Sequence, residues 1–162
     1  MTYEEWEQTV PKTIRSDVLW TVTAYRLALF LIDTAWNDVV RLEQEHKTRG
    51  IADQLSRALG SIGANVAEGY SRSTGKERAH FYEYGLGSAR EARHWYWQGR
   101  HVLGEAIIQH RLGLLDQIIR LLITMIPQQR RDGTIREDPA SYEISVENAV
   151  SGASSRLTPG AC

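Results

Sequence analysis

Apolar residues recur every three to four positions along four stretches of the chain, and in three of these stretches they form two stripes instead of one. The first stretch, residues 17–46, shows the pattern most clearly. One of its stripes consists of Val18, Val22, Tyr25, Leu29, Ile32, Trp36 and Val40, and the other of Trp20, Ala24, Leu27, Leu31, Ala35 and Leu42. A helix that packs on one side needs a single stripe. Two stripes therefore predict a helix that is buried on two sides, by its own bundle and by a second molecule.

The same period predicts further helices over residues 51–68, 76–102 and 105–126. Their expected core stripes are Ile51, Leu55, Ala58, Leu59, Ile62 and Val66; Phe81, Tyr84, Ser88, Ala92, Trp95 and Val102; and Ile108, Leu112, Leu115, Ile119, Leu122 and Ile126. Ser16 is expected to cap the first helix, Gly50 to interrupt the pattern, residues 69–75 to form a turn, and Pro127 to end the last helix. Short connections between four helices indicate an all-α, antiparallel up-down-up-down four-helix bundle.

Charge divides the chain into three parts. Residues 132–162 carry a net charge of −3 and residues 1–17 a net charge of −2, whereas residues 18–131 carry +4. The last part also turns to Gly, Pro and Ser with little periodicity. We therefore expect an N-terminal extension over residues 1–15, the bundle over residues 16–131, and an irregular acidic tail over residues 132–162.

Several features point to a soluble cytoplasmic protein. The 162 residues suit one domain. No run approaches the roughly 18 apolar residues of a membrane helix, and the acidic N-terminus lacks the pattern of a secretory signal. The only cysteine is Cys162, so an internal disulfide is excluded. We expect no association with a membrane.

Two Glu-x-x-His motifs, Glu43 to His46 and Glu91 to His94, have the spacing found in di-iron bundles. The first lies at the end of its predicted helix and the second lies off the predicted core stripe, so that surface ion pairing is favoured over metal binding. No zinc-protease motif and no glycine-rich phosphate loop occurs. We therefore expect a protein that is not an enzyme and has no metal or cofactor.

Basic side chains favour a nucleic-acid partner. Of the 19 basic residues only three are lysine, and arginine suits planar contacts with phosphates or carboxylates. Exposed aromatic rings can stack on unpaired bases. The candidate contact residues are Arg72, Lys76, Arg78, Arg90, Arg93, Trp97 and Arg100. In the alternative interpretation the neighbouring Trp95 and Tyr96 belong to the core, and the arginines pair with Glu77, Glu83 and Glu91.

A longer pattern begins within the second predicted helix. Residues 55–72 read LSRALGSIGANVAEGYSR, and Lys76-Glu77, Phe81 and Leu86-Gly-Ser-Ala-Arg-Glu91 follow. Over residues 17–127 this succession resembles the four helix bundle proteins encoded by intervening sequences in bacterial 23S rRNA genes. The matching positions are Arg57, Ser61, Asn65, Glu68, Gly69, Arg72, Phe81, Gly87, Ser88 and Glu91. Gly63 stands where that family often has proline, and the acidic tail is an addition.

The resemblance implies a homopentamer of antiparallel bundles without catalytic residues. It also implies nucleic-acid binding, because a related group serves as accessory subunits that bind RNA and the reverse transcriptases of diversity-generating retroelements. The doubled stripes favour an oligomer independently, since a monomer would expose too much apolar surface. The second stripe of the first helix, with Trp20, Leu27 and Leu31, is the predicted oligomer interface.

These observations lead to two functional hypotheses. The first is an oligomeric scaffold that binds structured RNA or a nucleoprotein such as a reverse transcriptase complex. The second is a protein–protein adaptor whose acidic tail engages a partner without nucleic acid. Within the first hypothesis, the tail is expected to compete with RNA for Arg90, Arg93 and Arg100. A polar cluster of Arg57, Glu68 and Arg72 is expected at the end of the second helix.

Overall fold

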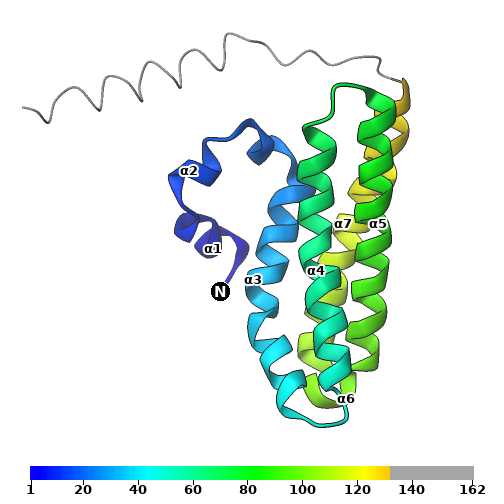
Figure 1. Cartoon of the computed structure of the whole chain (residues 1–162). Helices are drawn as coiled ribbons and strands as arrows, with labels where there is room; N and C mark the ends of the chain where they lie inside the picture. The colour runs from blue at the N-terminus through cyan, green and yellow to red at the C-terminus, as the bar shows by residue number, and fades with distance from the viewer. Residues whose placement is uncertain (132–162) are drawn as a thin grey trace, which may run out of the picture.

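The computed structural model describes residues 1–131, and every regular element in that range is helical (Figure 1). The elements are α1 (Tyr3–Thr9), α2 (Lys12–Arg15), the 3-10 helix η1 (Val18–Thr21), α3 (Thr23–Gln44), α4 (Arg49–Tyr70), α5 (Gly75–Gln98), α6 (Arg100–Leu103) and α7 (Glu105–Arg131). The irregular acidic tail predicted for residues 132–162 lies outside the described residues.

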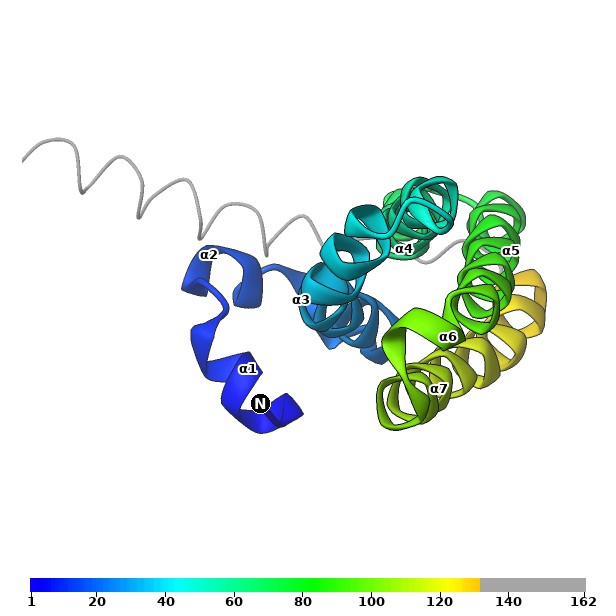
Figure 2. The same cartoon turned by 90° about the horizontal axis from the view of Figure 1, so that it is seen from below.

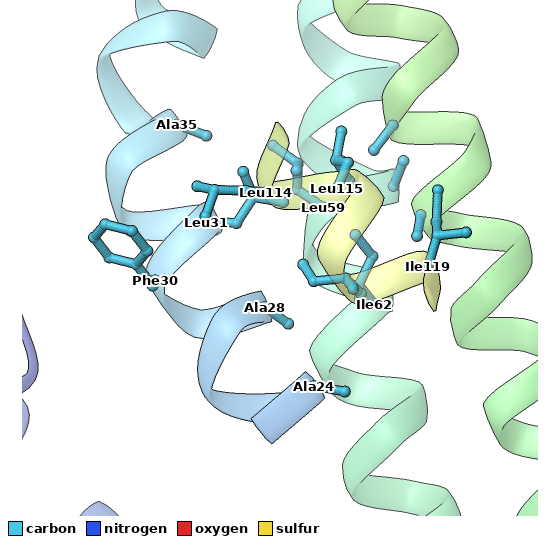
Figure 3. Packing of buried hydrophobic residues seen from close by; sticks show 14 of the residues in the cluster. Ala24, Ala28, Phe30, Leu31, Ala35, Leu59, Ile62, Leu114, Leu115 and Ile119 are labelled. Atoms are coloured by element: carbon cyan, nitrogen blue, oxygen red, sulfur yellow. The ribbon is translucent and has the colours of Figure 1, made fainter. Parts of the chain in front are cut away.

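Four long helices, α3, α4, α5 and α7, lie side by side around a shared hydrophobic core (Figures 1 and 2). Large side chains that are fully buried come from all four, among them Leu31, Leu55, Tyr82 and Leu115. Figure 3 shows Ala24, Ala28, Leu31 and Ala35 on the side of α3 that faces the other helices. The small residues on this side let α3 lie close to α4.

The first long helix begins later than the sequence predicts. Asp17, and not Ser16, acts as a cap: its carboxylate accepts a hydrogen bond of 2.7 Å from the backbone N–H of Leu19. This cap starts only the single 3-10 turn of η1, because Val22 is extended and α3 starts at Thr23. The predicted start at Ser16 is therefore wrong.

Other predicted helix ends also differ from the structure. Gly50 and Gly69 lie inside α4, whereas Gly99 separates α5 from α6 within the predicted third helix. Pro127 lies inside α7 and does not end it. Pro127 and Ile123, four residues earlier, are both exposed, so water can solvate the carbonyl that loses its hydrogen-bond donor at the proline.

The core face of α5 differs from the predicted stripe. Its buried residues are Gly75, Arg78, Ala79, Tyr82, Gly85, Ala89, Ala92 and Tyr96. Of the predicted stripe only Ala92 is buried, while Tyr84 is exposed. A Cβ on Gly85 would lie 3.5 Å from the carbonyl oxygen of Ile62, so small residues form the close contact with α4. Phe81, Tyr84 and Trp95, the aromatic residues of the predicted stripe, lie beside this buried face and not on it.

The N-terminal segment covers the outer side of α3. The indole of Trp6 is buried and lies 6.1 Å from the ring of Trp20 and 5.3 Å from that of Phe30, between ring centroids. Its Nε1 donates a hydrogen bond of 2.6 Å to Asp33. Figure 3 shows that Phe30 points away from the core residues of α3. An apolar surface that suggested a second molecule is therefore covered by α1 of the same chain.

The predicted oligomer interface needs correction for this reason. Leu31 is completely buried in the core of its own chain, Trp20 packs against Trp6, and Leu27 is half-buried. The other stripe, which includes Leu29, Ile32 and Trp36, is the one that faces outward. Trp36 on that stripe is 72% exposed. Helical periodicity identified both stripes, but the stripe predicted to be the oligomer interface is the one that faces the core.

Candidate nucleic-acid interface

One side of α5 carries the basic and aromatic residues that the sequence singled out. Arg90, Arg93 and Trp97 follow one another at spacings of three and four residues, which places them on the same side of a helix. Together with His94 and with Leu112 of α7 they line a shallow groove. Arg90 and Arg93 are exposed, and the Trp97 side chain is 51% exposed.

The carboxylates nearest in sequence do not neutralise this groove. Glu91 accepts a hydrogen bond of 3.2 Å from Nε1 of Trp95, and Glu83 pairs with Arg130 at the far end of the helix. Within residues 1–131, Arg90 and Arg93 form no ion pair. The alternative interpretation, in which glutamates neutralise the arginines, is therefore wrong for these two.

Arg100 lies over the indole of Trp97. Its guanidinium carbon is 4.4 Å from the centroid of the ring, a distance typical of a cation–π contact. Its Nη1 also donates a hydrogen bond of 2.7 Å to the backbone carbonyl of Trp97. Of the neighbouring aromatic residues, Tyr96 belongs to the core and Trp95 is half-buried. Trp97 is thus the aromatic residue that the groove exposes.

Three of the predicted contact residues lie at the other end of α5. Arg72 pairs with Glu68 and lies over the ring of Phe81, with 4.7 Å to its centroid. Lys76 lines a separate hollow with Arg130. A helical separation of 15 residues places Arg78 about 22 Å along the axis from Arg93. The seven predicted residues therefore do not form one surface.

Arg78 is a correction to the predicted contact residues. Its side chain is only 5% exposed, because it stands one turn before Tyr82 on the core face of α5. Its Nε and Nη2 atoms are buried without a hydrogen-bond partner in the described part of the chain. A side chain in this position is not available to a phosphate on the surface.

The predicted polar cluster at the end of α4 is only partly present. Glu68 and Arg72 form an exposed ion pair, but Arg57 pairs with Asp53 at 3.0 Å. Arg57 precedes Glu68 by 11 residues, which is about 16 Å along a helix. Arg57 therefore cannot reach Glu68, and its prediction as a member of the cluster is wrong.

The remaining positions of the sequence pattern make local contacts. Asn65 Nδ2 donates to the carbonyl of Ser61 at 2.8 Å, and Ser88 Oγ donates to that of Tyr84 at 3.0 Å. Gly69 lies against α5, whereas a Cβ on Gly87 would meet no atom within 4 Å. These contacts belong to the helices and to their packing.

A buried polar network, which none of the sequence-based predictions included, joins α3, α5 and α7. Asp38 is buried and accepts hydrogen bonds from Arg111 Nε at 2.7 Å and from the Tyr96 hydroxyl at 3.1 Å. Burial, and then the charge of Asp38, raise the pKa of Tyr96 well above its usual range. Burial and the neighbouring Arg111 lower the pKa of His110. Asp38 follows Leu31 and Ala35 at helical spacing. A carboxylate within that apolar stripe is the sequence feature that could have indicated a buried ion pair.

The outer side of α3 and α4 carries an apolar groove. Tyr25, Leu29 and Ile32 of α3 line it together with the small residues Gly60, Gly63, Ala64 and Ala67 of α4. Trp36 continues this side of α3 one turn beyond Ile32. Small side chains in such a groove leave room for the side chains of another helix.

Neither a metal site nor a membrane helix occurs in residues 1–131. No three His, Cys, Asp or Glu side chains gather there in a way that would hold a metal ion. Glu91 of the second Glu-x-x-His motif bonds to Trp95, as described above. No helix in the same range is long and apolar enough to span a membrane.

The long-helix region is similar to a known protein family and to solved structures. The family model of the 23S rRNA-intervening sequence protein matches residues 21–124. The crystal structure of a protein of unknown function from the S23 ribosomal protein family of Bacteroides thetaiotaomicron has 21% sequence identity and a TM-score of 0.60. The similarity covers 64% of this chain and 98% of that chain. No curated protein matches. Helices α1 and α2 precede the residues that the family model matches.

Proposed function

Because the chain belongs to the 23S rRNA-intervening sequence protein family, we propose that it is a non-enzymatic cytoplasmic scaffold that binds structured RNA. In this proposal the four long helices form an antiparallel up-down-up-down four-helix bundle, and several copies assemble into a homo-oligomer. The observation that carries the proposal is the groove on α5, where Arg90 and Arg93 are exposed beside Trp97 and form no ion pair with any residue of the described range 1–131.

Unpaired arginines favour a polyanionic partner. An arginine already paired with a carboxylate must lose that contact before it binds a phosphate, whereas Arg90 and Arg93 have no such contact to lose within residues 1–131. Phosphate contacts of this kind supply most of the affinity of proteins for nucleic acids. An assembly multiplies the net charge of +4 of residues 18–131 and so strengthens the attraction.

Association of the copies is proposed to use the apolar groove between α3 and α4. Trp36, at 72% exposure, and the residues that line the groove would leave water when another helix packs there. The subunit number of five follows only from the sequence resemblance and stays a prediction, as does a reverse transcriptase partner.

Fluorescence anisotropy with a labelled RNA hairpin tests RNA binding. The Arg90→Ala/Arg93→Ala variant should lose most of its affinity, and the slope of log affinity against log salt should fall by about 1–2, because up to two phosphate contacts are lost. The matched control is Arg57→Ala/Arg120→Ala, which removes two exposed arginines that pair with Asp53 and Asp116 on their own helices. This control should bind nearly as tightly as the wild-type protein.

Two results would contradict the RNA-binding proposal. One is equal loss of affinity in both double variants, which would show that net charge alone matters. The other is a wild-type protein that binds no RNA at low salt. The second result would favour the adaptor, whose binding to a protein partner does not need phosphates.

Light scattering on a size-exclusion column tests the association. Ile32→Glu places a charge in the groove and should give smaller species with the same helix content. Ile123→Glu is the control, since Ile123 is 48% exposed on α7 and does not line the groove. A monomeric wild-type protein at micromolar concentration would refute the oligomer.

A further inference from the structure

The contact between Trp97 and Arg100 adds an aromatic ring to a surface that needs only positive charge to bind phosphates. The large, half-exposed indole lines the same groove as Arg90 and Arg93. Exposed indole surface is unfavourable in water, and burial of it would stabilise a complex. The groove therefore offers one apolar, planar contact among several ionic ones.

Arg100 holds this contact in place before any ligand binds. Its hydrogen bond to the carbonyl of Trp97 holds the guanidinium over the indole ring, 4.4 Å from the ring centroid. Since the guanidinium is planar, the pair offers stacking surface to another flat group at little further loss of side-chain freedom.

Arg93 and Arg90 lie along the helix from this pair. They precede Trp97 by four and seven residues, which corresponds to rises of about 6 Å and 10 Å along the helix axis. A nucleotide whose base stacks on the pair would thus have its neighbouring phosphates beside two cations that form no ion pair within residues 1–131. Leu112 of α7 supplies an apolar wall to the same groove.

We infer that Trp97 and Arg100 form a binding site for one unpaired nucleotide, so that the RNA this protein selects contains a single-stranded loop, bulge or end. The inference rests on the proposed RNA-binding function. Bases inside a continuous duplex stack on one another and leave no face for the indole, whereas an unpaired base exposes one. Duplex RNA would be held only through its phosphates.

The test compares two labelled RNAs of equal length and charge, a hairpin with an unpaired loop and a blunt, fully paired duplex. Trp97→Ala should weaken binding of the hairpin about five- to a hundredfold, the range for one stacked base. It should change binding of the duplex less than about twofold. Tyr84→Ala is the matched control, because Tyr84 lies on the same helix with the same exposure of 51% and should leave both affinities unchanged.

Further measurements test whether the indole of Trp97 stacks on a base. Trp97→Phe keeps an aromatic face and should restore part of the affinity for the hairpin, while Arg100→Ala should weaken it. A 2-aminopurine base in the loop should be quenched by the wild-type protein and not by Trp97→Ala. Circular dichroism checks that each variant has the helix content of the wild-type protein.

The failure of this inference differs from that of the proposed function. If Arg90→Ala/Arg93→Ala abolishes binding but Trp97→Ala binds the hairpin as the wild-type protein does, the nucleotide site is wrong and RNA binding stands. Equal weakening of hairpin and duplex by Trp97→Ala also overturns the site. If the wild-type protein binds neither RNA at low salt, both proposals fall.

Discussion

Replacing Gly69 by alanine, with Gly87→Ala as its control, would measure how closely α4 and α5 pack. A Cβ on Gly69 would lie 2.8 and 2.9 Å from two ring carbons of Tyr82 and 3.0 Å from Cβ of Phe81. Carbon atoms ordinarily approach to about 3.5–4.0 Å. The Tyr82 ring is buried and a Cβ moves only with its backbone, so neither neighbour can yield without a shift of α5.

The magnitude follows from two opposing effects. Overpacking a well-filled contact destabilises a protein by about 1–3 kcal/mol. Exchange of glycine for alanine within a helix stabilises it by about 0.5–1 kcal/mol. A Cβ on Gly87 meets nothing within 4 Å, so Gly87→Ala should show the stabilisation alone. The difference between the two variants therefore isolates the steric effect, which we expect to be about 1–3 kcal/mol.

Urea unfolding followed by circular dichroism at one fixed protein concentration measures this difference. Gly69→Ala should have a lower urea midpoint than Gly87→Ala. The free energy of unfolding of the two variants should depend equally on the urea concentration, because unfolding exposes the same surface in both. Equal midpoints would refute the close approach of α4 and α5 at Gly69. A higher midpoint for Gly69→Ala would refute it as well.

Further predictions concern the buried network and the N-terminal segment. Arg111→Met leaves Asp38 buried without its positively charged partner and should reduce the free energy of unfolding by about 3–5 kcal/mol, whereas Asp38→Leu/Arg111→Met should recover much of this in the same urea assay. Tyr96→Phe removes one neutral donor to Asp38 and should destabilise by about 1 kcal/mol. Trp6→Ala should free α1, so that limited proteolysis cleaves near residue 10 while α3–α7 stay intact; equal resistance to the wild-type protein would contradict this.

The periodic apolar pattern predicted where the long helices lie but not which of their sides face inward. On α3 the buried stripe contains Ala24, Ala28 and Ala35, and the larger residues around Trp36 lie outside. The stripe that contains Ala24 and Ala35 was predicted to be the oligomer interface. That prediction is wrong because close helix packing here depends on small side chains. On α5 the same effect places Gly85 inside.

The sequence predicted that some of the candidate contact residues lie close together on one helix. Spacings of three and four residues put Arg90, Arg93 and Trp97 on one side of α5, and the structure brings them together. Arg78 was included because it is close in sequence, although its position one turn before Tyr82 puts it on the core face. Because each residue adds about 1.5 Å along a helix, arginines 15 residues apart cannot belong to one small surface even when they lie on the same helix.

The position of α1 has a consequence for the number of directions in which copies of this chain can join. A subunit with two unrelated apolar faces has two ways to associate, and mixtures of both give branched aggregates instead of closed assemblies. Trp6 covers Trp20 and Phe30 within the chain, so that among the apolar surfaces of α3 in residues 1–131 the α3–α4 groove is the one that the proposed association would use. In the proposed assembly the N-terminal segment would thereby limit the number of apolar contact faces on each subunit, and a fusion that displaces α1 would be expected to add one.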